Sequence, residues 1–200
     1  EKYFVQINES GNISSIIDKT LANKELLKKP IGYHVMHSKG GAPYPAWEIR
    51  YADISGIPWE FAGEGETEIV ECGPARVTLK CHQKTDHADY TYYVSLTAGG
   101  KYVEVQNEID WNTTRAILKN RFSFTASNKT ASFDLGLGAI GRGNRTKKLY
   151  EVPAQRWADI SDEKNFYEDD RIINYMLSRA KIGIIIVGVN HFTINFYFNK

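Results

Sequence analysis

Apolar and polar side chains alternate along much of this sequence, and the alternation predicts β-strands. Apolar residues occupy every second position from Val77 to Cys81 and from Val103 to Val105, with polar or charged residues between them. Because successive side chains of a strand point to opposite faces, each run predicts a strand with one buried face. The predicted strands are Tyr3–Ile7, Ile13–Asp18, Ile31–His37, Thr67–Cys72, Ala75–Lys84, Asp89–Leu96, Tyr102–Asp110 and Ala116–Thr125.

The spacing of these strands predicts the fold class. Glycine, proline, asparagine or aspartate bounds most of them, and no helical pattern alternates with them. Such spacing is typical of antiparallel sandwiches, so we predict an all-β fold. Three connections are less regular. Asp18–Leu27 suits a short helix or a turn into another strand, Ser38–Pro58 suits a long ordered loop, and the glycine-rich Asp134–Gly143 suits a bend or bulge.

Composition narrows the range of partners. The 200 residues are 42% hydrophobic and 12% aromatic, enough for a core, and the net charge is +1. That balance predicts neither a nucleic-acid partner nor a membrane partner, and no apolar run approaches the roughly 20 residues of a membrane helix. Cys72 and Cys81 are the only cysteines, and we expect two free buried thiols.

The stretch from Tyr150 to Ser161 carries the most distinctive chemistry. If it is extended, Gln155, Trp157 and Asp159 share one face, with Arg156 on the other. An amide, a flat indole ring and a carboxylate on one face suit a sugar, which offers hydroxyls and an apolar ring face. The alternative is a strand whose Trp157 packs in the core and whose polar groups pair internally.

Histidine spacing gives little support for a metal site. His34 and His37 would share a face on a helix, but the surrounding pattern predicts a strand, on which they point opposite ways. Cys81, His82, Asp86 and His87 resemble ligands in composition only, and a solvated hairpin explains the last three better.

Four stretches resemble glycoside hydrolase family 38, the zinc-dependent α-mannosidases, in the β region at their C-terminal end. They are Gly11-Asn-Ile-Ser-Ser-Ile-Ile-Asp-Lys19 with Lys24-Glu-Leu26, Pro45-Ala-Trp-Glu-Ile49, Glu108-Ile-Asp-Trp-Asn112 with Ile117-Leu-Lys119 and Arg121-Phe122, and Glu151-Val-Pro-Ala-Gln-Arg-Trp-Ala-Asp159. The resemblance implies a super-sandwich of the galactose-mutarotase-like type. It also implies an N-terminal catalytic domain in the same polypeptide, where the catalytic residues and the zinc ligands lie.

The resemblance therefore assigns no catalytic or metal-binding residue, and no cofactor, to this chain. It allows two placements of the fourth motif: at the mannose site or the seam between domains, or packed inside the sandwich. On the first placement Gln155, Arg156, Trp157 and Asp159 are the candidate substrate-binding or interdomain residues, together with Trp47 of the second motif.

The resemblance ends near Asp162. We predict a partial β-sandwich domain over residues 1–162 and a divergent β-rich tail over 163–200, frame-shifted or unrelated to the family. Ile172–Leu177 and Ile182–Phe198 are its two strand candidates. The sequence starts without a methionine or a signal-peptide pattern, so we expect a piece of a longer polypeptide and a cytoplasmic location.

Three functions fit these observations. The first is the non-catalytic sandwich of an α-mannosidase, which supports hydrolysis of terminal α-mannosyl linkages and is inactive alone. The second is a stand-alone carbohydrate-binding module that stacks the aromatic side chains of Tyr44, Trp47, Trp59 and Trp157 on mannosides. The third is a mutarotase-like enzyme, in which His34 or His82 serves as the base.

Overall fold

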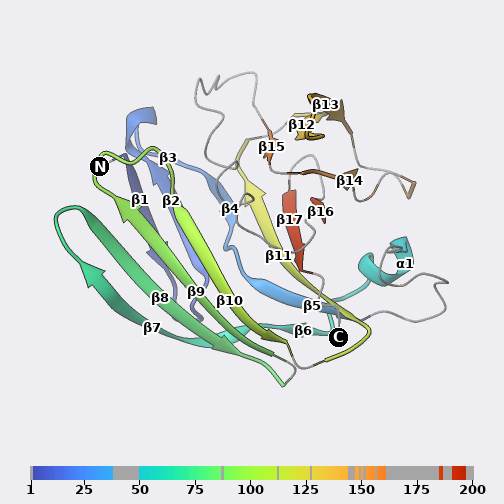
Figure 1. The fold of residues 1–200 in the computed structure, drawn as a ribbon, viewed down its shortest axis with the longest axis horizontal. Coiled ribbons are helices and arrows are strands. Elements are labelled where there is room, and N and C mark those ends of the chain that lie inside the picture. The colour runs from blue at the N-terminus through green and yellow to red at the C-terminus, as the bar shows by residue number, and fades with distance from the viewer. Residues whose placement is uncertain are drawn as a thin grey trace.

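The computed structural model describes residues 2–37, 50–86, 88–111, 113–126, 128–143, 147–148, 150, 152–155, 157–160, 185–186 and 191–196. Within these ranges nearly all regular structure is β-strand, and every strand pair is antiparallel (Figure 1). The predicted all-β fold class is confirmed. No helix in the described ranges is both long and apolar enough to cross a membrane.

One layer of the sandwich is a four-stranded sheet in the order β10-β9-β8-β7. Its strands are β7 (Gly63–Cys72), β8 (Arg76–Lys84), β9 (Ala88–Thr97) and β10 (Glu104–Trp111). The register is continuous between β8 and β9 and between β9 and β10, whereas β7 shifts its register twice against β8. The predicted strands in this region are therefore confirmed, with ends that differ by a few residues.

The opposite layer contains a sheet in the order β17-β11-β5-β6, with one further strand on β11. Its strands are β4 (Leu27–Lys29), β5 (Tyr33–His37), β6 (Glu60–Phe61), β11 (Ala116–Phe124) and β17 (His191–Phe196). Strand β17 pairs with β11 from Leu118 to Ser123 and falls inside the predicted strand Ile182–Phe198. The other strand predicted in the tail, Ile172–Leu177, lies outside the described residues.

The first strands form a three-stranded sheet beside this layer. β1 (Tyr3–Ile7) and β2 (Ile13–Asp18) make the predicted hairpin, and β3 (Lys24–Glu25) pairs with β2. Asp18 caps the N-terminus of a 3-10 turn, η1 (Lys19–Leu21). Its buried carboxylate accepts hydrogen bonds from the Thr20 backbone amide at 2.8 Å and from the Thr20 hydroxyl at 2.6 Å. The segment Asp18–Leu27 thus contains both features that its sequence allowed, a helical turn and then a strand.

The core lies between the two layers. Tyr33 of β5 stacks on Tyr90 of β9 with ring centroids 5.4 Å apart, and its hydroxyl donates to the side-chain oxygen of Asn107. The fully buried side chains include Val35, Cys81, Tyr90, Leu118 and Phe133. These residues come from both layers, so the sheets share one core.

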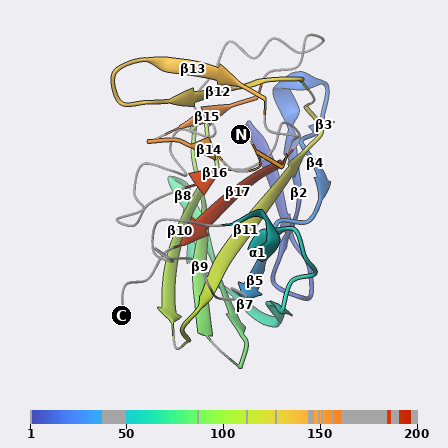
Figure 2. The same cartoon turned by 90° about the vertical axis from the view of Figure 1, so that its right-hand side faces the viewer.

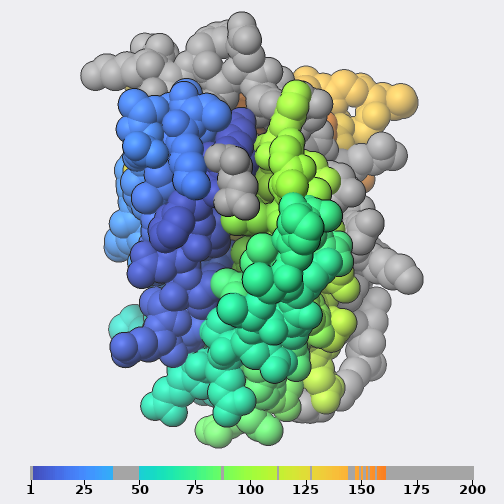
Figure 3. All heavy atoms as spheres, turned by 90° about the vertical axis from the view of Figure 1, so that its left-hand side faces the viewer, coloured from blue at the N-terminus to red at the C-terminus, as the bar shows by residue number. Residues whose placement is uncertain are grey.

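A buried glutamine fastens the β1–β2 turn to the four-stranded sheet. The side-chain amide of Gln83 donates to the Ser10 carbonyl at 2.5 Å and to the Asn12 side-chain oxygen at 3.0 Å. Gly11 has a φ of +75°, and a Cβ there would meet Gln83 and the Gly65 backbone at 3.3 Å. The turn therefore needs glycine for its backbone conformation and for this close approach. Figure 3 shows β1 and β2 in blue beside β7 in blue-green on this face.

The glycine-rich segment differs from its prediction. It forms a hairpin of β12 (Ala131–Asp134) and β13 (Ala139–Arg142), rather than a bend or bulge. Gly136 and Gly138 have φ of +83° and +112°, and the Leu135 amide donates to the Gly138 carbonyl at 2.9 Å. The glycines form the tight turn of the hairpin, which the sequence pattern did not separate from a bulge.

Two further predictions need correction. The predicted long loop contains a helical turn, α1 (Tyr51–Ile54), while its residues 38–49 lie outside the described part of the chain. Both cysteines are free, but only Cys81 is buried. Cys72 is exposed because it ends β7, which lies at the edge of its sheet.

Candidate functional site

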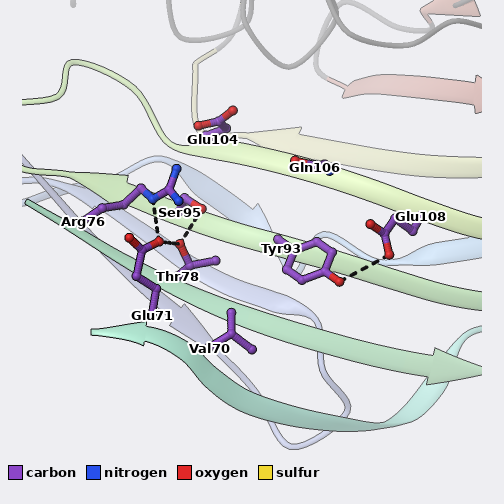
Figure 4. Close-up of a pocket in the computed structure, with 9 residues that line it drawn as sticks. All are labelled: Val70, Glu71, Arg76, Thr78, Tyr93, Ser95, Glu104, Gln106 and Glu108. Carbon is purple, nitrogen blue, oxygen red and sulfur yellow. Dashed lines mark hydrogen bonds and ion pairs between the residues drawn. The ribbon is translucent and has the colours of Figure 1, made fainter. Parts of the chain in front are cut away.

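A polar groove lies on the outer face of the four-stranded sheet. It has a volume of about 490 Å³ and is open to solvent, and Figure 4 shows its side chains on the face away from β1 and β2. Its lining residues are Val70, Glu71, Arg76, Thr78, Tyr93, Ser95, Glu104, Gln106 and Glu108. All four strands of the sheet contribute to it.

Alternation along β10 explains the polar character of the groove. Glu104, Gln106 and Glu108 point outward, whereas Val105 and Ile109 on the opposite face pack against the core. The register of β9 against β10 places Ser95 beside Glu104 and Tyr93 beside Gln106. The same alternation that buries one face of the sheet thus aligns a row of polar groups on the other.

A hydrogen-bonded cluster forms one end of the groove. The carboxylate of Glu71 accepts hydrogen bonds from the Arg76 guanidinium at 2.6 Å and from the Thr78 hydroxyl at 3.1 Å. The hydroxyl oxygens of Thr78 and Ser95 are 2.9 Å apart, and these residues are 6% and 8% exposed. The hydrogen bond from Arg76 is the largest cause that lowers the pKa of Glu71, so this carboxylate is charged at neutral pH.

The other end of the groove contains the aromatic ring of Tyr93 and the side-chain amide of Gln106, which can hydrogen-bond a ligand. The Tyr93 hydroxyl donates to Glu108 at 3.3 Å, and both side chains remain accessible. Gln106 is exposed between Glu104 and Glu108. An amide, carboxylates and a ring face can together hydrogen-bond the hydroxyls of a neutral sugar and stack on its apolar face.

The stretch predicted as a candidate site lies in a different part of the molecule. It consists of β14 (Val152–Pro153) and β15 (Ala158–Asp159), which pair with β16 (Ile185–Ile186) and β12 respectively. The chain is therefore two short strands with an irregular segment between them. Asp134 of β12 forms two backbone hydrogen bonds with this segment. Its N–H donates to the Trp157 carbonyl at 3.0 Å, and its carbonyl accepts from the backbone N–H of Gln155 at 2.9 Å.

Burial still alternates along this stretch. Val152, Ala154, Ala158 and Ile160 are buried, whereas Gln155 is exposed and Trp157 and Asp159 are half-buried. Trp157 does not belong to the buried core cluster. The three predicted side chains are thus the accessible ones, while Arg156 and Trp47 lie outside the described residues.

The groove was not predicted from the sequence. The alternation at Glu104, Gln106 and Glu108 marked an outward polar row, but their neighbours on β8 and β9 follow only from the strand register. The structure places this groove and the Gln155 stretch on different sheets, so they are separate candidate surfaces.

The two histidines considered as metal ligands or as bases, His34 and His82, lie on different sheets. His34 is on β5, where it packs against Phe61 with ring centroids 6.0 Å apart, and the imidazole of His82 on β8 lies 3.1 Å from the Asp89 carboxylate. Burial is the main cause that lowers the pKa of His34 to about 4. In the described part of the chain no three His, Cys, Asp or Glu side chains converge in a way that could hold a metal ion.

Comparison with known proteins identifies the family. Residues 1–168 match the family model described as the glycosyl hydrolases family 38 C-terminal domain. The chain therefore belongs to glycosyl hydrolase family 38, as its C-terminal domain. No curated protein sequence matches the chain.

Solved structures show the same fold. An α-mannosidase from Enterococcus faecalis V583 superposes with a TM-score of 0.67 over 96% of this chain at 12% identity. A glycosyl hydrolase family 38 protein from Enterococcus faecalis gives a TM-score of 0.68 over 100% of this chain, also at 12% identity. The chain spans only 24% and 27% of the length of these two proteins, respectively.

Proposed function

We propose that this chain is the non-catalytic β-sandwich of an α-mannosidase. It would support hydrolysis of terminal α-mannosyl linkages by a catalytic domain elsewhere in the same polypeptide. The match of residues 1–168 to the C-terminal domain of the family is the observation that carries the proposal. The reaction would retain configuration through a covalent glycosyl intermediate. The zinc would be held by that catalytic domain, not by this chain.

Within that enzyme, the Gln155 stretch would lie at the substrate or at the seam between domains. Its accessible side chains support this placement, because an exposed amide and a half-buried indole leave capacity for a further partner. Arg156 and Trp47 are assigned to the same surface on the family resemblance alone.

Kinetics of the purified chain and of the full-length polypeptide test the proposal. The 200-residue chain should not cleave an aryl α-mannoside, whereas the full-length polypeptide should cleave it and lose activity on removal of zinc by a chelator. Turnover by the chain alone would refute the assignment as a non-catalytic domain. An inactive, folded full-length polypeptide would refute the substrate assignment.

Variants of the Gln155 stretch test its role. Gln155→Ala and Trp157→Ala in the full-length polypeptide should lower kcat/KM by about tenfold, the effect of losing roughly 1.4 kcal/mol of transition-state binding. Gln6→Ala is the matched control, since Gln6 is an exposed amide on β1, away from this stretch. If all three variants have the same kcat/KM, the Gln155 stretch contacts neither the substrate nor the domain seam.

The groove on the four-stranded sheet favours a second candidate function, a carbohydrate-binding module. Its mixture of ring face, amide and carboxylates supports binding of mannosides with a Kd of about 1 mM, or roughly −4 kcal/mol. Titration followed by NMR should shift the resonances of Tyr93 and Gln106, and Tyr93→Ala should weaken binding more than Gln6→Ala does. No shift at about 10 mM, tenfold above that Kd, would exclude this function.

A further inference from the structure

The groove on the four-stranded sheet carries more negative charge than a neutral sugar requires. Three of its nine lining side chains are the carboxylates of Glu71, Glu104 and Glu108. Arg76 is the one cation among the nine, and its guanidinium binds Glu71 at 2.6 Å. The positive charge is therefore used at the β7 end of the groove, while the rim formed by β10 adds two negative charges.

These carboxylates are too far apart to share a metal ion. Glu104 and Glu108 are four residues apart on β10, or about 13 Å at the rise of a strand, and Glu71 lies three strands away on β7. The oxygen ligands of one calcium or magnesium ion lie within about 2.6 Å of it. The groove therefore offers separate negative charges rather than a chelating site.

Tyr93 places an aromatic ring beside one of these charges. The strand register pairs Tyr93 with Gln106, which lies midway between Glu104 and Glu108 on β10. The Tyr93 hydroxyl donates to Glu108 at 3.3 Å, as Figure 4 shows, and a carboxylate can accept further hydrogen bonds. A ring face and a carboxylate both attract a cation, so this corner of the groove suits an ammonium group.

A lysine next to the ring shows the effect of Glu108 on a positive charge. Lys80 pairs with Tyr93 across β8 and β9, and its ammonium donates to Glu68 of β7 at 2.8 Å. The hydrogen bond to Glu68 is the largest cause that raises the pKa of Lys80, and the charge of Glu108 raises it further. Glu108 thus attracts a cation near Tyr93, while the ammonium of Lys80 is bound to Glu68.

The rest of the lining suits the hydroxyl groups of a sugar. Gln106 exposes an amide that can donate and accept, and the hydroxyl oxygens of Thr78 and Ser95 are 2.9 Å apart at the floor. The volume of about 490 Å³ is in the range of small-molecule sites. Figure 2 shows β9 and β10 on the side of the molecule opposite to β2 and β4, so the β1–β2 hairpin does not cover the groove.

We propose that the groove binds sugars that carry a protonated amine, with the ammonium group between the Tyr93 ring and the Glu108 carboxylate. The inference rests on carbohydrate binding in the groove, the second candidate function above, and narrows its ligand to an amino sugar with a free amine. Neutral sugars would bind through hydroxyl and ring contacts alone, and the carboxylates would repel anionic sugars.

Titrations with matched sugars test the proposal. Mannosamine differs from mannose in one position, where an amine that is protonated at about pH 6 replaces a hydroxyl. In low salt the 200-residue chain should bind mannosamine about fivefold more tightly than mannose or N-acetylmannosamine, the upper range for an exposed ion pair. NMR shifts at Tyr93 and Gln106 locate the binding. Salt at about 0.5 M should remove most of the preference, because it screens exposed charges. Equal affinities for the three sugars in low salt would overturn the proposal.

Substitutions at two positions should change the affinity in opposite directions. Glu108→Gln removes the charge and should lower mannosamine binding to about the level of mannose. Lys80→Gln removes a competing cation and should tighten mannosamine binding several-fold, a gain that misfolding does not produce. Glu9→Gln is the control, since Glu9 is an exposed carboxylate in the turn between β1 and β2. Equal mannosamine affinities in Glu108→Gln and Glu9→Gln would overturn the proposal.

The inference and the function on which it rests can fail separately. Mannose binding at Tyr93 without a preference for mannosamine would retain carbohydrate binding and overturn the inference. Mannosamine binding without a response to mannose would retain the inference and remove mannosides as ligands. Nα-acetyl-lysine amide supplies an ammonium group without a sugar. If it binds as tightly as mannosamine, the inference is overturned, because the groove then recognises a lysine side chain.

Discussion

His34 is expected to make the stability of this domain depend on pH between about 4 and 6.5. Its imidazole packs against Phe61, and Lys119 lies directly opposite it in the β5–β11 pairing. Burial is the largest cause that lowers the pKa of His34 from 6.5 to about 4, and the cationic side chains of Lys119 and Arg121 lower it further. The folded protein therefore keeps this imidazole neutral at pH values where the unfolded chain protonates it.

The sign and size of the effect follow from proton binding. Below pH 6.5 the unfolded chain binds a proton at His34, which the folded protein binds only near pH 4. Because the unfolded state then holds more protons, the free energy of unfolding decreases as the pH falls. At roughly 1.36 kcal/mol for each unit of pKa, the full decrease is about 3 kcal/mol, and about 2.5 kcal/mol of it occurs between pH 7.5 and 4.5.

Urea unfolding of three proteins isolates this contribution. The wild type, His34→Gln and His37→Gln are compared at pH 7.5 and 4.5, with His37 as the control because it is an exposed histidine at the end of the same strand. The wild type and His37→Gln should lose about 2.5 kcal/mol more than His34→Gln over this range. The same pH dependence in all three proteins would refute the assignment of a neutral, half-buried His34.

Three further predictions concern single positions. Gly11→Ala should destabilise the domain by about 1 kcal/mol more than Gly99→Ala in urea titrations. Both glycines have positive φ, but only at position 11 would a Cβ meet neighbouring atoms, at 3.3 Å. Tyr33→Phe should cost about 1 kcal/mol by the same assay, because the half-buried side-chain oxygen of Asn107 loses its donor. Maleimide should modify exposed Cys72 at once, but buried Cys81, whose pKa is raised by burial, only after unfolding.

Strands with a clear two-residue period were predictable from the sequence. β8 and β10 each have one face that packs on the core and another that carries charge, so their pattern alone defined them. The β12–β13 hairpin was not predictable in this way, because β13 is exposed on both faces and has no period of two. A strand that buries neither face leaves no alternation in its sequence.

The groove shows a different limit of prediction from a single sequence. Its ion pair joins Glu71 of β7 to Arg76 of β8, and its floor joins Thr78 of β8 to Ser95 of β9. Each residue alone is an ordinary outward polar side chain of a strand. Only the register between strands brings them together, and one sequence does not specify the register in advance. For the Gln155 stretch the sequence left open whether Trp157 packs in the core, and the structure shows this side chain half-buried.

The charges on the edge strand bear on carbohydrate binding in the groove. The edge strand β7 carries Glu64, Glu66, Glu68 and Glu71, and charged side chains on an edge strand oppose pairing with another chain. Ile69 and Val70 of the same strand are exposed, so these charges offset an apolar edge that would otherwise favour such pairing. An unpaired β7 leaves the groove, which Val70 and Glu71 line, open to a small ligand.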